Sequence, residues 1–561
     1  MRPSEYPPPF DPEEVIAAPS DPEPIDVGVL IVGAGPAGLA CAIRLQQLLE
    51  NAPGIAETLG DVPVAVIDKG SKPGAHLLSG AVVNPVSLRR LFEGRRRVAD
   101  MPFFGSVEGE SVYYLTRKHA SWIPTPPTMR NHGNFVASLS QLGRWLGEQA
   151  EEAGVTILPE TSGERLLVTD GRVRGVRTGD RGLGKDGEPG ARHEPGSDLV
   201  ARATVLAEGT QGHLTGAAIS HFGLEGENPQ VWALGVKEVW RVAKPLDRVI
   251  HTMGWPLRGA AKYREFGGSF VYPMGEDMLT VGMVVGLDYR DVELSVHDLL
   301  QELKTHPKIE KLLRDGERIA WGAKTIPEGG WYALPRELHA PGLALVGDAA
   351  GTVNVPALKG IHYGVESGIL AAEAIFAALQ PGEVVWRPGA LAPYDEAVRK
   401  GMIGKDLYRV RNMRQVFGKG FVMGSALAGA ATVSGGRIPG GRYAGERDAD
   451  QELLRSDRAK SYPVQDGKLT FDKLSSVYLS GNKTRDDAPN HIRIETRVPR
   501  EVAELWVRMC PAQVYEVGTE DAGKVQVVVT PSNCVQCGAI TAKGGRLTPP
   551  EGGAGPEYTL T

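Results

Sequence analysis

The hydrophobic and polar positions of residues 27–50 follow two patterns in succession. An apolar run over residues 29–32 predicts a buried strand, and the next segment, PAGLACAIRLQQLLE, predicts a helix of small and apolar residues. The turn between them reads GAGPAG and places Gly33, Gly35 and Gly38 at the spacing G-x-G-x-x-G. At this spacing Gly33 allows the tight turn, Gly35 lets the backbone approach a pyrophosphate, and Gly38 allows close helix–strand packing. The pattern therefore predicts a dinucleotide-binding unit.

Two later strands end in acidic residues. The second apolar strand ends at Asp68, where an acidic side chain normally accepts hydrogen bonds from the adenosine ribose. A much later strand ends in Gly347-Asp348 and opens onto a long helix of small residues. This arrangement is similar to the second FAD fingerprint of the glutathione-reductase-type flavoproteins, in which Asp348 would reach the ribityl chain. The segment 203–214, ATVLAEGTQGHL, resembles the strand that crosses behind the FAD, so the three motifs favour FAD over NAD.

Three other regions differ from this α/β pattern. Residues 216–335 alternate apolar runs with turn residues, which predicts an antiparallel sheet covering the flavin. Residues 417–441 have few charges and are too Gly-rich for a spanning helix, which leaves two interpretations: a helix that dips into a membrane interface, or a buried Gly/Ala packing helix. Residues 1–26 are acidic and Pro-rich, and they predict a flexible tail with no signal or transit peptide.

Composition and charge narrow the class of protein. A chain of 561 residues is too long for one hydrophobic core, so roughly two to four domains are expected. The net charge of −6 argues against a nucleic-acid partner, because phosphate binding needs a clustered basic surface. The 71 glycines indicate many tight turns and close backbone approaches, as in a protein that wraps a large cofactor.

The chain has four cysteines, three of them in its last tenth: Cys41, Cys510, Cys534 and Cys537. So few cysteines indicate a reducing compartment, and Cys41, on the first predicted helix, is expected to be a small buried residue. Cys510 precedes a proline, and Cys534 and Cys537 form a C-x-x-C pair, which together resemble a ferredoxin-like clamp. Such a clamp would have another cysteine where the chain has Ile540. A zinc site would need a fourth ligand, for which His491 is the nearest candidate.

Motifs in the same order along the chain resemble one family, the electron-transfer flavoprotein–ubiquinone oxidoreductases. The likeness runs from about residue 27 to the end, and GAHLLSG and CPAQVYE separate it from general FAD monooxygenases. The resemblance implies an α/β fold with a glutathione-reductase-type, Rossmann-like FAD-binding domain, an antiparallel β quinone-binding domain and a C-terminal ferredoxin-like iron–sulfur domain. The expected boundaries are 27–215 and 336–415 for the FAD domain, 216–335 for the quinone domain, 416–464 for a membrane-interface or connecting segment, and 465–561 for the iron–sulfur domain.

The resemblance also implies roles for single residues. The FAD-binding positions are Gly33, Gly35, Gly38, Asp68, Gly347 and Asp348. Gly267 and Gly268 match the glycine pair whose backbone contacts the ubiquinone headgroup, since adjacent glycines let a flat ring approach closely. The three C-terminal cysteines match three of the four ligands of a [4Fe–4S] cluster, and the fourth position falls on Ile540, which has no donor atom. Three outcomes remain open: a [4Fe–4S] cluster with another fourth ligand, a [3Fe–4S] cluster, or loss of the cluster.

The implied function is electron transfer from reduced electron-transfer flavoprotein, through the cluster and FAD, to ubiquinone. The expected location is the cytoplasmic face of a bacterial inner membrane, as a peripheral, monotopic protein. The cofactors carry this chemistry, so no catalytic residue is assigned. Two alternatives stay open. One is an FAD-dependent hydroxylase or polyprenyl reductase on the same scaffold, although those lack the cysteine module. The other is a non-catalytic FAD-binding protein with a relic cluster domain.

Overall fold

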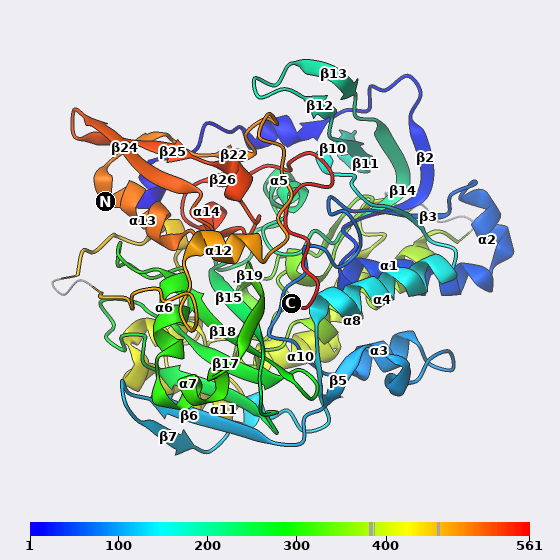
Figure 1. The fold of residues 1–561 in the computed structure, drawn as a ribbon. Helices are drawn as coiled ribbons and strands as arrows, with labels where there is room; N and C mark the ends of the chain where they lie inside the picture. The colour runs from blue at the N-terminus through cyan, green and yellow to red at the C-terminus, as the bar shows by residue number, and fades with distance from the viewer. Residues whose placement is uncertain (381–384, 386, 457–459) are drawn as a thin grey trace.

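The structure is a computed structural model that describes residues 1–380, 385, 387–456 and 460–561. Figure 1 shows a mainly parallel sheet with helices α1, α4 and α8, a second sheet with helices α6 and α7, and a C-terminal module above the second sheet. The fold is thus α/β, as the sequence predicts.

The first sheet has the strand order β1-β10-β11-β14-β2-β3-β9, and β21 also pairs with β14. Its central strands are parallel: β2 (Ile25–Val32), β3 (Val64–Ile67), β14 (Asp198–Leu206) and β21 (Leu343–Leu345). The apolar runs of these strands are buried because helices cover a parallel sheet. The helices beside it are α1 (Pro36–Glu50), α4 (Leu139–Glu152) and α8 (Ile361–Ala378).

The second sheet has the order β19-β15-β18-β17-β16-β6-β7. Its strands are β6 (Glu110–Leu115), β7 (Ala120–Ile123), β15 (Trp232–Arg241), β16 (Val249–Gly254), β17 (Gly267–Pro273), β18 (Met278–Gly286) and β19 (Glu317–Pro327). All neighbours are antiparallel except β16 and β6. The sequence-based boundary placed β6 and β7 in the FAD domain. They belong to this sheet instead, because long-range pairing with β16 decides their position.

The C-terminal module consists of short strands and helices. Its main elements are α12 (Lys473–Tyr478), α13 (Arg500–Met509), β24 (Tyr515–Asp521), β25 (Lys524–Val529) and α14 (Ala539–Ala542). The chain then returns to the FAD domain, where the N–H of Ser140 donates to the carbonyl of Thr561 at 2.9 Å. The N–H of Ala323 on β19 also donates to the hydroxyl of Tyr558 at 3.1 Å, so the module contacts helix α4 of the FAD domain and the second sheet rather than hanging from a linker.

The N-terminal segment is not a flexible tail, contrary to the prediction. Strand β1 (Ile16–Ala17) pairs with β10 (Gly163–Thr169), and Val15 is buried in the core of the FAD domain. The N–H groups of Ser20 and Asp21 donate to the carboxylate of Asp198 at 2.7 and 3.0 Å. Prolines restrict the unfolded chain, so an extended, Pro-rich segment loses little entropy when it lies along the surface.

Helix α11 (Phe421–Ser434) is largely exposed, which contradicts the interpretation of a buried packing helix. Only Gly424 and Ala431 are buried, whereas Val422 and Val433 are 83% and 91% exposed. Among the residues that the structure describes, no helix is long and apolar enough to cross a membrane. A charge-free apolar helix thus lies on the surface without covering contacts along most of its length.

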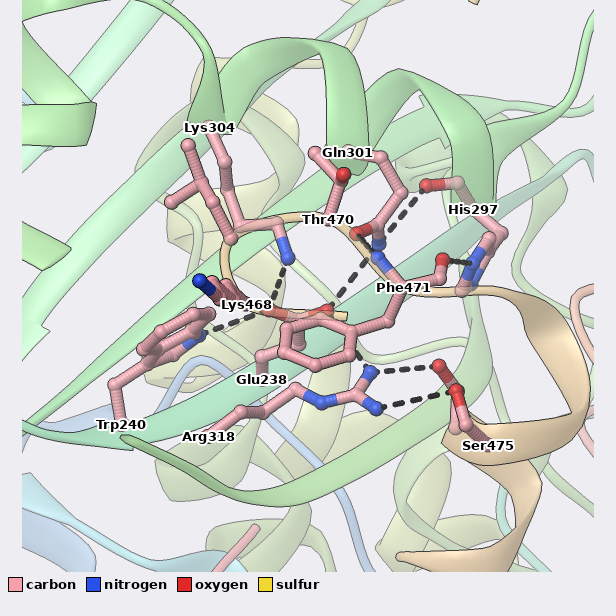
Figure 2. A network of polar contacts seen from close by, with 12 residues as sticks. Glu238, Trp240, His297, Gln301, Lys304, Arg318, Lys468, Thr470, Phe471 and Ser475 are labelled. Carbon is pink, nitrogen blue, oxygen red and sulfur yellow. Dashed lines mark hydrogen bonds and ion pairs between the residues drawn. The ribbon is translucent and has the colours of Figure 1, made fainter. Parts of the chain in front are cut away.

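A buried charge network joins the second sheet to the start of the C-terminal module (Figure 2). Glu238 on β15 accepts hydrogen bonds from Lys304 Nζ and Trp240 Nε1, both at 2.8 Å, and the side chains of Glu238 and Lys304 are fully buried. Arg318 Nη1 lies 3.4 Å from the other carboxylate oxygen and 2.7 Å from Ser476 Oγ of α12. Burial alone would raise the pKa of Glu238, but the two cations and their hydrogen bonds outweigh it and lower that pKa.

Backbone contacts extend the same network. His297 Nε2 lies 3.0 Å from the carbonyl of Phe471, and the N–H of Phe471 donates to Gln301 Oε1 at 2.9 Å. Both His297 and Gln301 belong to α6 (Val296–Lys304). One buried carboxylate therefore holds the sheet, helix α6 and the module together.

Candidate functional site

The first glycine motif forms the turn between β2 and α1, and each glycine is needed for a different reason. Gly33 has φ +111°, and a Cβ there would lie 2.3 Å from the carbonyl oxygen of Ala207. A Cβ on Gly38 would lie 2.1 Å from the carbonyl oxygen of Gly33. Gly35 is different, because its Cβ would meet only Leu77 Cδ2, at 3.9 Å, and the residue lines a large cavity. Gly33 and Gly38 thus fix the turn, while Gly35 leaves space on the cavity side.

Asp68 lines the same cavity and stabilises the glycine turn. Its Oδ2 accepts the N–H of Ala34 and its Oδ1 accepts the N–H of Gly70, both at 2.7 Å. Burial raises the pKa of this carboxyl, although the two backbone N–H groups and Lys69 oppose the shift. Each oxygen keeps a further lone pair, so the predicted hydrogen bond to a ribose stays a prediction.

The second motif brings Gly347 and Asp348 to the same cavity. Gly347 has φ +64°, its N–H donates to Ser367 Oγ at 2.9 Å, and a Cβ there would lie 2.7 Å from Ala37 Cβ of α1. Asp348 lines the cavity, and burial raises its pKa to about 6. The two motifs, far apart in the sequence, therefore face one cavity, with the start of α8 beside them.

The predicted quinone glycines lie apart from that cavity. Gly267 has φ +152° and would place a Cβ 2.0 Å from the carbonyl oxygen of Val284, and neither Gly267 nor Gly268 is among its described lining residues. Phe270 and Tyr272, further along β17, do line the cavity. The Tyr272 hydroxyl lies 2.7 Å from His251 Nε2, and both side chains are buried. Sequence motifs did not reveal this pair, because a buried His–Tyr contact across two strands has no characteristic spacing.

The three C-terminal cysteines surround one small cavity, which Ile540 also lines. The N–H groups of Val514 and Gln536 point at the sulfurs of Cys510 and Cys534, each at 3.4 Å. In the described parts of the chain, no three His, Cys, Asp or Glu side chains converge on a point that could hold a single ion. His491, the candidate fourth ligand of a zinc site, is not among the residues described around this cavity. Cys41 is fully buried in α1, as expected.

Lysines lie within Coulombic reach of the three thiols. The charge of Lys473 interacts with Cys510, that of Lys69 with Cys534, and that of Lys324 with both Cys537 and Cys534. Burial lowers the pKa of Lys324 to about 8. Two buried thiols with backbone N–H donors and the partly buried thiol of Cys537, all near positive charges, fit the ligands of an iron–sulfur cluster, for which thiolate is the bound form.

The cysteine loop and the FAD cavity share a wall. The N–H and Oγ1 of Thr325 on β19 both donate to the carbonyl of Cys537 at 2.8 Å, and Lys324 Nζ donates to that of Gln536 at 3.1 Å. Gln211 Nε2 donates to the carbonyl of Gly538 at 2.8 Å. Both β19 residues and Gln211 also line the FAD cavity. No sequence motif indicates these contacts, because they run from side chains without characteristic spacing to backbone carbonyls.

Two family models match the chain. Residues 232–326 match the model described as ETF-QO, ubiquinone-binding, and residues 467–559 match that of the 4Fe–4S domain of electron transfer flavoprotein-ubiquinone oxidoreductase. The mitochondrial electron transfer flavoprotein-ubiquinone oxidoreductase of Oryza sativa subsp. japonica is 37% identical, over 96% of this chain and 93% of that protein. The electron transfer flavoprotein-ubiquinone oxidoreductase of Pseudomonas aeruginosa is also 37% identical, over 96% of this chain and 99% of that protein.

A solved structure shares the fold of the larger part. The geranylgeranyl bacteriochlorophyll reductase-like protein of Thermoplasma acidophilum aligns with a TM-score of 0.56 and 17% identity, over 75% of this chain and 93% of that one. The chain is in the class of flavoprotein oxidoreductases with an iron–sulfur domain. This class is defined by two glycine motifs on one cavity, a quinone-binding sheet and a cysteine module. The chain belongs to the electron transfer flavoprotein–ubiquinone oxidoreductase family.

Proposed function

We propose that this chain accepts electrons from reduced electron-transfer flavoprotein and passes them, through an iron–sulfur centre and FAD, to ubiquinone. The observation that carries the proposal is the wall shared by the cysteine loop and the FAD cavity. When bound, the two cofactors supply the one-electron steps by which a quinone takes up two electrons and two protons. Thr325, Lys324 and Gln211 hold the cysteine loop at a fixed position against the cavity, which is what electron transfer between two centres requires.

Quinone reduction tests this proposal directly. Purified protein, supplied with its reduced partner flavoprotein, is expected to reduce a soluble ubiquinone analogue without any nicotinamide cofactor. Absence of turnover, with FAD and iron both present, would contradict the proposal. Oxidation of NAD(P)H by the protein alone would favour a reductase or hydroxylase on the same scaffold.

Tyr272 is a candidate proton donor to the quinone. Tyr272 lines the cavity, and its hydroxyl lies 2.7 Å from His251 Nε2. Burial lowers the pKa of His251 to about 3 and raises the pKa of Tyr272, so at neutral pH both groups are uncharged and the hydroxyl keeps its proton. As its Nε2–H tautomer, the neutral imidazole can donate a hydrogen bond to the hydroxyl oxygen, which leaves the hydroxyl proton free for the quinone.

Replacing Tyr272 by Phe is expected to slow quinone reduction at least about tenfold, because the positioned proton donor is lost and solvent must replace it. Reduction of the bound FAD by the partner flavoprotein should stay near the wild-type rate, since that step does not use the hydroxyl. Stopped-flow absorbance separates the two steps. Equal slowing of both steps would assign Tyr272 a structural role only.

We propose further that the chain sits peripherally on the cytoplasmic face of a bacterial inner membrane, with α11 in the interface. Support comes from the exposed apolar side chains of α11 and from the aromatic contact of Phe421 with Tyr114 on β6, whose ring centroids are 5.5 Å apart. Trp122, 61% exposed on β7, is of the type enriched at membrane–water interfaces. The resemblance also implies a membrane contact for the segment 74–95, whose Arg90 pairs with Glu373, and this contact stays a prediction.

The double variant Val422→Asp/Val433→Asp is expected to bind phospholipid vesicles at least about tenfold more weakly. Burial of a valine in the interface stabilises binding by about 1.5 kcal/mol or more, and each change replaces such a valine by a charged aspartate. Vesicle flotation of the holoprotein measures the effect. Val464→Asp is the control, because Val464 is 90% exposed but lies thirty residues beyond the end of α11. Equal binding of both variants would rule out α11 as the attachment site.

A further inference from the structure

The cysteine cavity has a hydrocarbon wall where a fourth ligand would stand. Cys510, Cys534, Cys537 and Ile540 all line this cavity, and Ile540 is only 4% exposed. Ile540 is placed on α14, three residues after Cys537, by a turn at Gly538 that has φ +89°. The local backbone therefore presents position 540 to the cavity, as a fourth thiolate would need, but the side chain there cannot bind a metal.

Packing holds Ile540 firmly in this position. A Cβ on Gly545 would lie 2.6 Å from Ile540 Cγ1 and 2.8 Å from Ile494 Cγ2, so the isoleucine is wedged against a glycine and another isoleucine. The N–H groups of Lys543 and Gly545 donate to the carbonyl of Ile540 at 3.0 and 2.9 Å. A rotamer change that would admit a water or hydroxide ligand at this corner is opposed by close contacts on both sides.

No other described side chain around the cavity can replace the missing ligand. Besides the three thiols, only Met509 and Tyr515 carry heteroatoms among the residues described there. Tyr515 offers a phenol hydroxyl, which is ordinarily protonated at neutral pH and is then not an anionic ligand. Met509 offers a neutral thioether, a weak acceptor compared with a thiolate.

The surrounding charges favour a bound cluster over relic thiols. Lys473, Lys69 and Lys324 lie within reach of the three sulfurs, and burial lowers the pKa of each lysine. Asp68 and Glu208 offset part of the charge of Lys69, Asp68 acts also on Lys324, and Asp298 acts on Lys473. Iron-bound thiolates would add negative charge beside these lysines, which neutral thiols would not.

We propose that Cys510, Cys534 and Cys537 hold a [3Fe–4S] centre, with Ile540 closing the corner that a fourth iron would occupy. The inference rests on the proposed function, because it assumes that these cysteines carry an iron–sulfur centre. The oxidised centre has a singly positive core, and with three thiolates its net charge is two minus. It takes up one electron without forming or breaking a bond, which suits transfer from a flavin in single steps. The nearby lysines stabilise the added negative charge and raise the reduction potential.

Anaerobically purified holoprotein tests the composition of the centre. Iron, acid-labile sulfide and FAD are measured together, and EPR spectra are recorded as isolated and after dithionite. About three irons per FAD are expected, with a signal in the oxidised protein that disappears on reduction. Incubation with ferrous iron and dithiothreitol should leave this ratio unchanged, because Ile540 blocks the fourth position. About four irons, uptake of a fourth iron, or absence of iron would each overturn the proposal.

Variants at position 540 provide the matched comparison. Ile540→Cys restores a thiolate at the same backbone position and is expected to give about four irons and an EPR signal only after reduction. Ile540→Val keeps a branched hydrocarbon and should retain about three irons. If Ile540→Cys does not fold, incubation of the wild type with ferrous iron still decides whether the centre holds three or four irons. The number of irons is measured independently of turnover. Three irons without quinone reduction would refute only the proposed function. Four irons with quinone reduction would refute only the proposed [3Fe–4S] centre.

Discussion

Replacement of Gly35 by Val is expected to give a folded protein that no longer retains FAD. Gly35 has φ −84° and ψ 175°, an extended conformation that any residue adopts, and its Cβ would meet only Leu77 Cδ2, at 3.9 Å. The apoprotein should therefore tolerate the side chain. The valine would instead occupy the space through which a pyrophosphate approaches the N-terminus of α1. A loss of roughly a hundredfold in FAD affinity, about 2.7 kcal/mol, is expected.

The measurement is FAD absorbance per chain after gel filtration, followed by titration of the apoprotein with FAD. Gly54→Val is the control, because a Cβ at Gly54 meets nothing within 4 Å and the residue is not among those described around the cavity. Gly33→Val should behave differently from both. Its φ of +111° and the nearby Ala207 oxygen predict a destabilised apoprotein as well as lost FAD. FAD affinity of Gly35→Val within about threefold of wild type would contradict the predicted pyrophosphate contact.

The second large effect is expected at the buried carboxylate of Figure 2. Glu238→Gln removes a negative charge that faces Lys304 at 2.8 Å and Arg318 at 3.4 Å, and it leaves two buried cations without their common partner. Breaking a buried ion pair in this way costs about 3–5 kcal/mol of unfolding free energy. Asp466 and Asp472 also act on these cations, but both are exposed and cannot take over the role.

Urea unfolding, followed by tryptophan fluorescence, measures this loss. Glu317→Gln is the matched control, since Glu317 pairs with Arg241 at the surface and should change stability by less than about 1 kcal/mol. The wild type should also lose stability in acid. The pKa of Glu238 is lowered in the fold, so its contribution is present above the ordinary carboxyl pKa and disappears as the pH falls through the lower, folded value. A cost below about 1 kcal/mol for Glu238→Gln would show that the network does not join the domains.

The parts of the site that the sequence predicted are those where the local backbone conformation or packing allows only one type of residue. Gly33, Gly38 and Gly347 are needed because of positive φ or contacts that leave no space for a Cβ, and such needs produce recognisable motifs. The cysteines were equally visible, because metal ligands keep fixed residue types and spacing. The meeting of all these motifs on two adjoining cavities follows from the fold and confirms the predicted FAD and iron–sulfur domains.

The parts that the sequence could not predict depend on tertiary contacts. Strands β6 and β7 were assigned to the wrong domain, because only pairing with β16 decides their sheet. The N-terminal segment has the composition of a flexible tail, yet Val15 is buried and β1 pairs with β10. Thr325 gives no local signal at all, because its contribution is a pair of hydrogen bonds to a distant carbonyl.

The position of β21 beside β14 has a consequence for how the chain is made on the ribosome. Residues 204–206 of β14 have β2 on one side, but their other neighbour is β21, which is synthesised only after the whole quinone-binding sheet. During translation this edge stays open, and an unpaired central strand is a site for chaperones or for misassembly. Non-local pairings of this kind also slow folding. The part of the FAD cavity that Gly347 and Asp348 line can therefore be completed only after β21 has been synthesised.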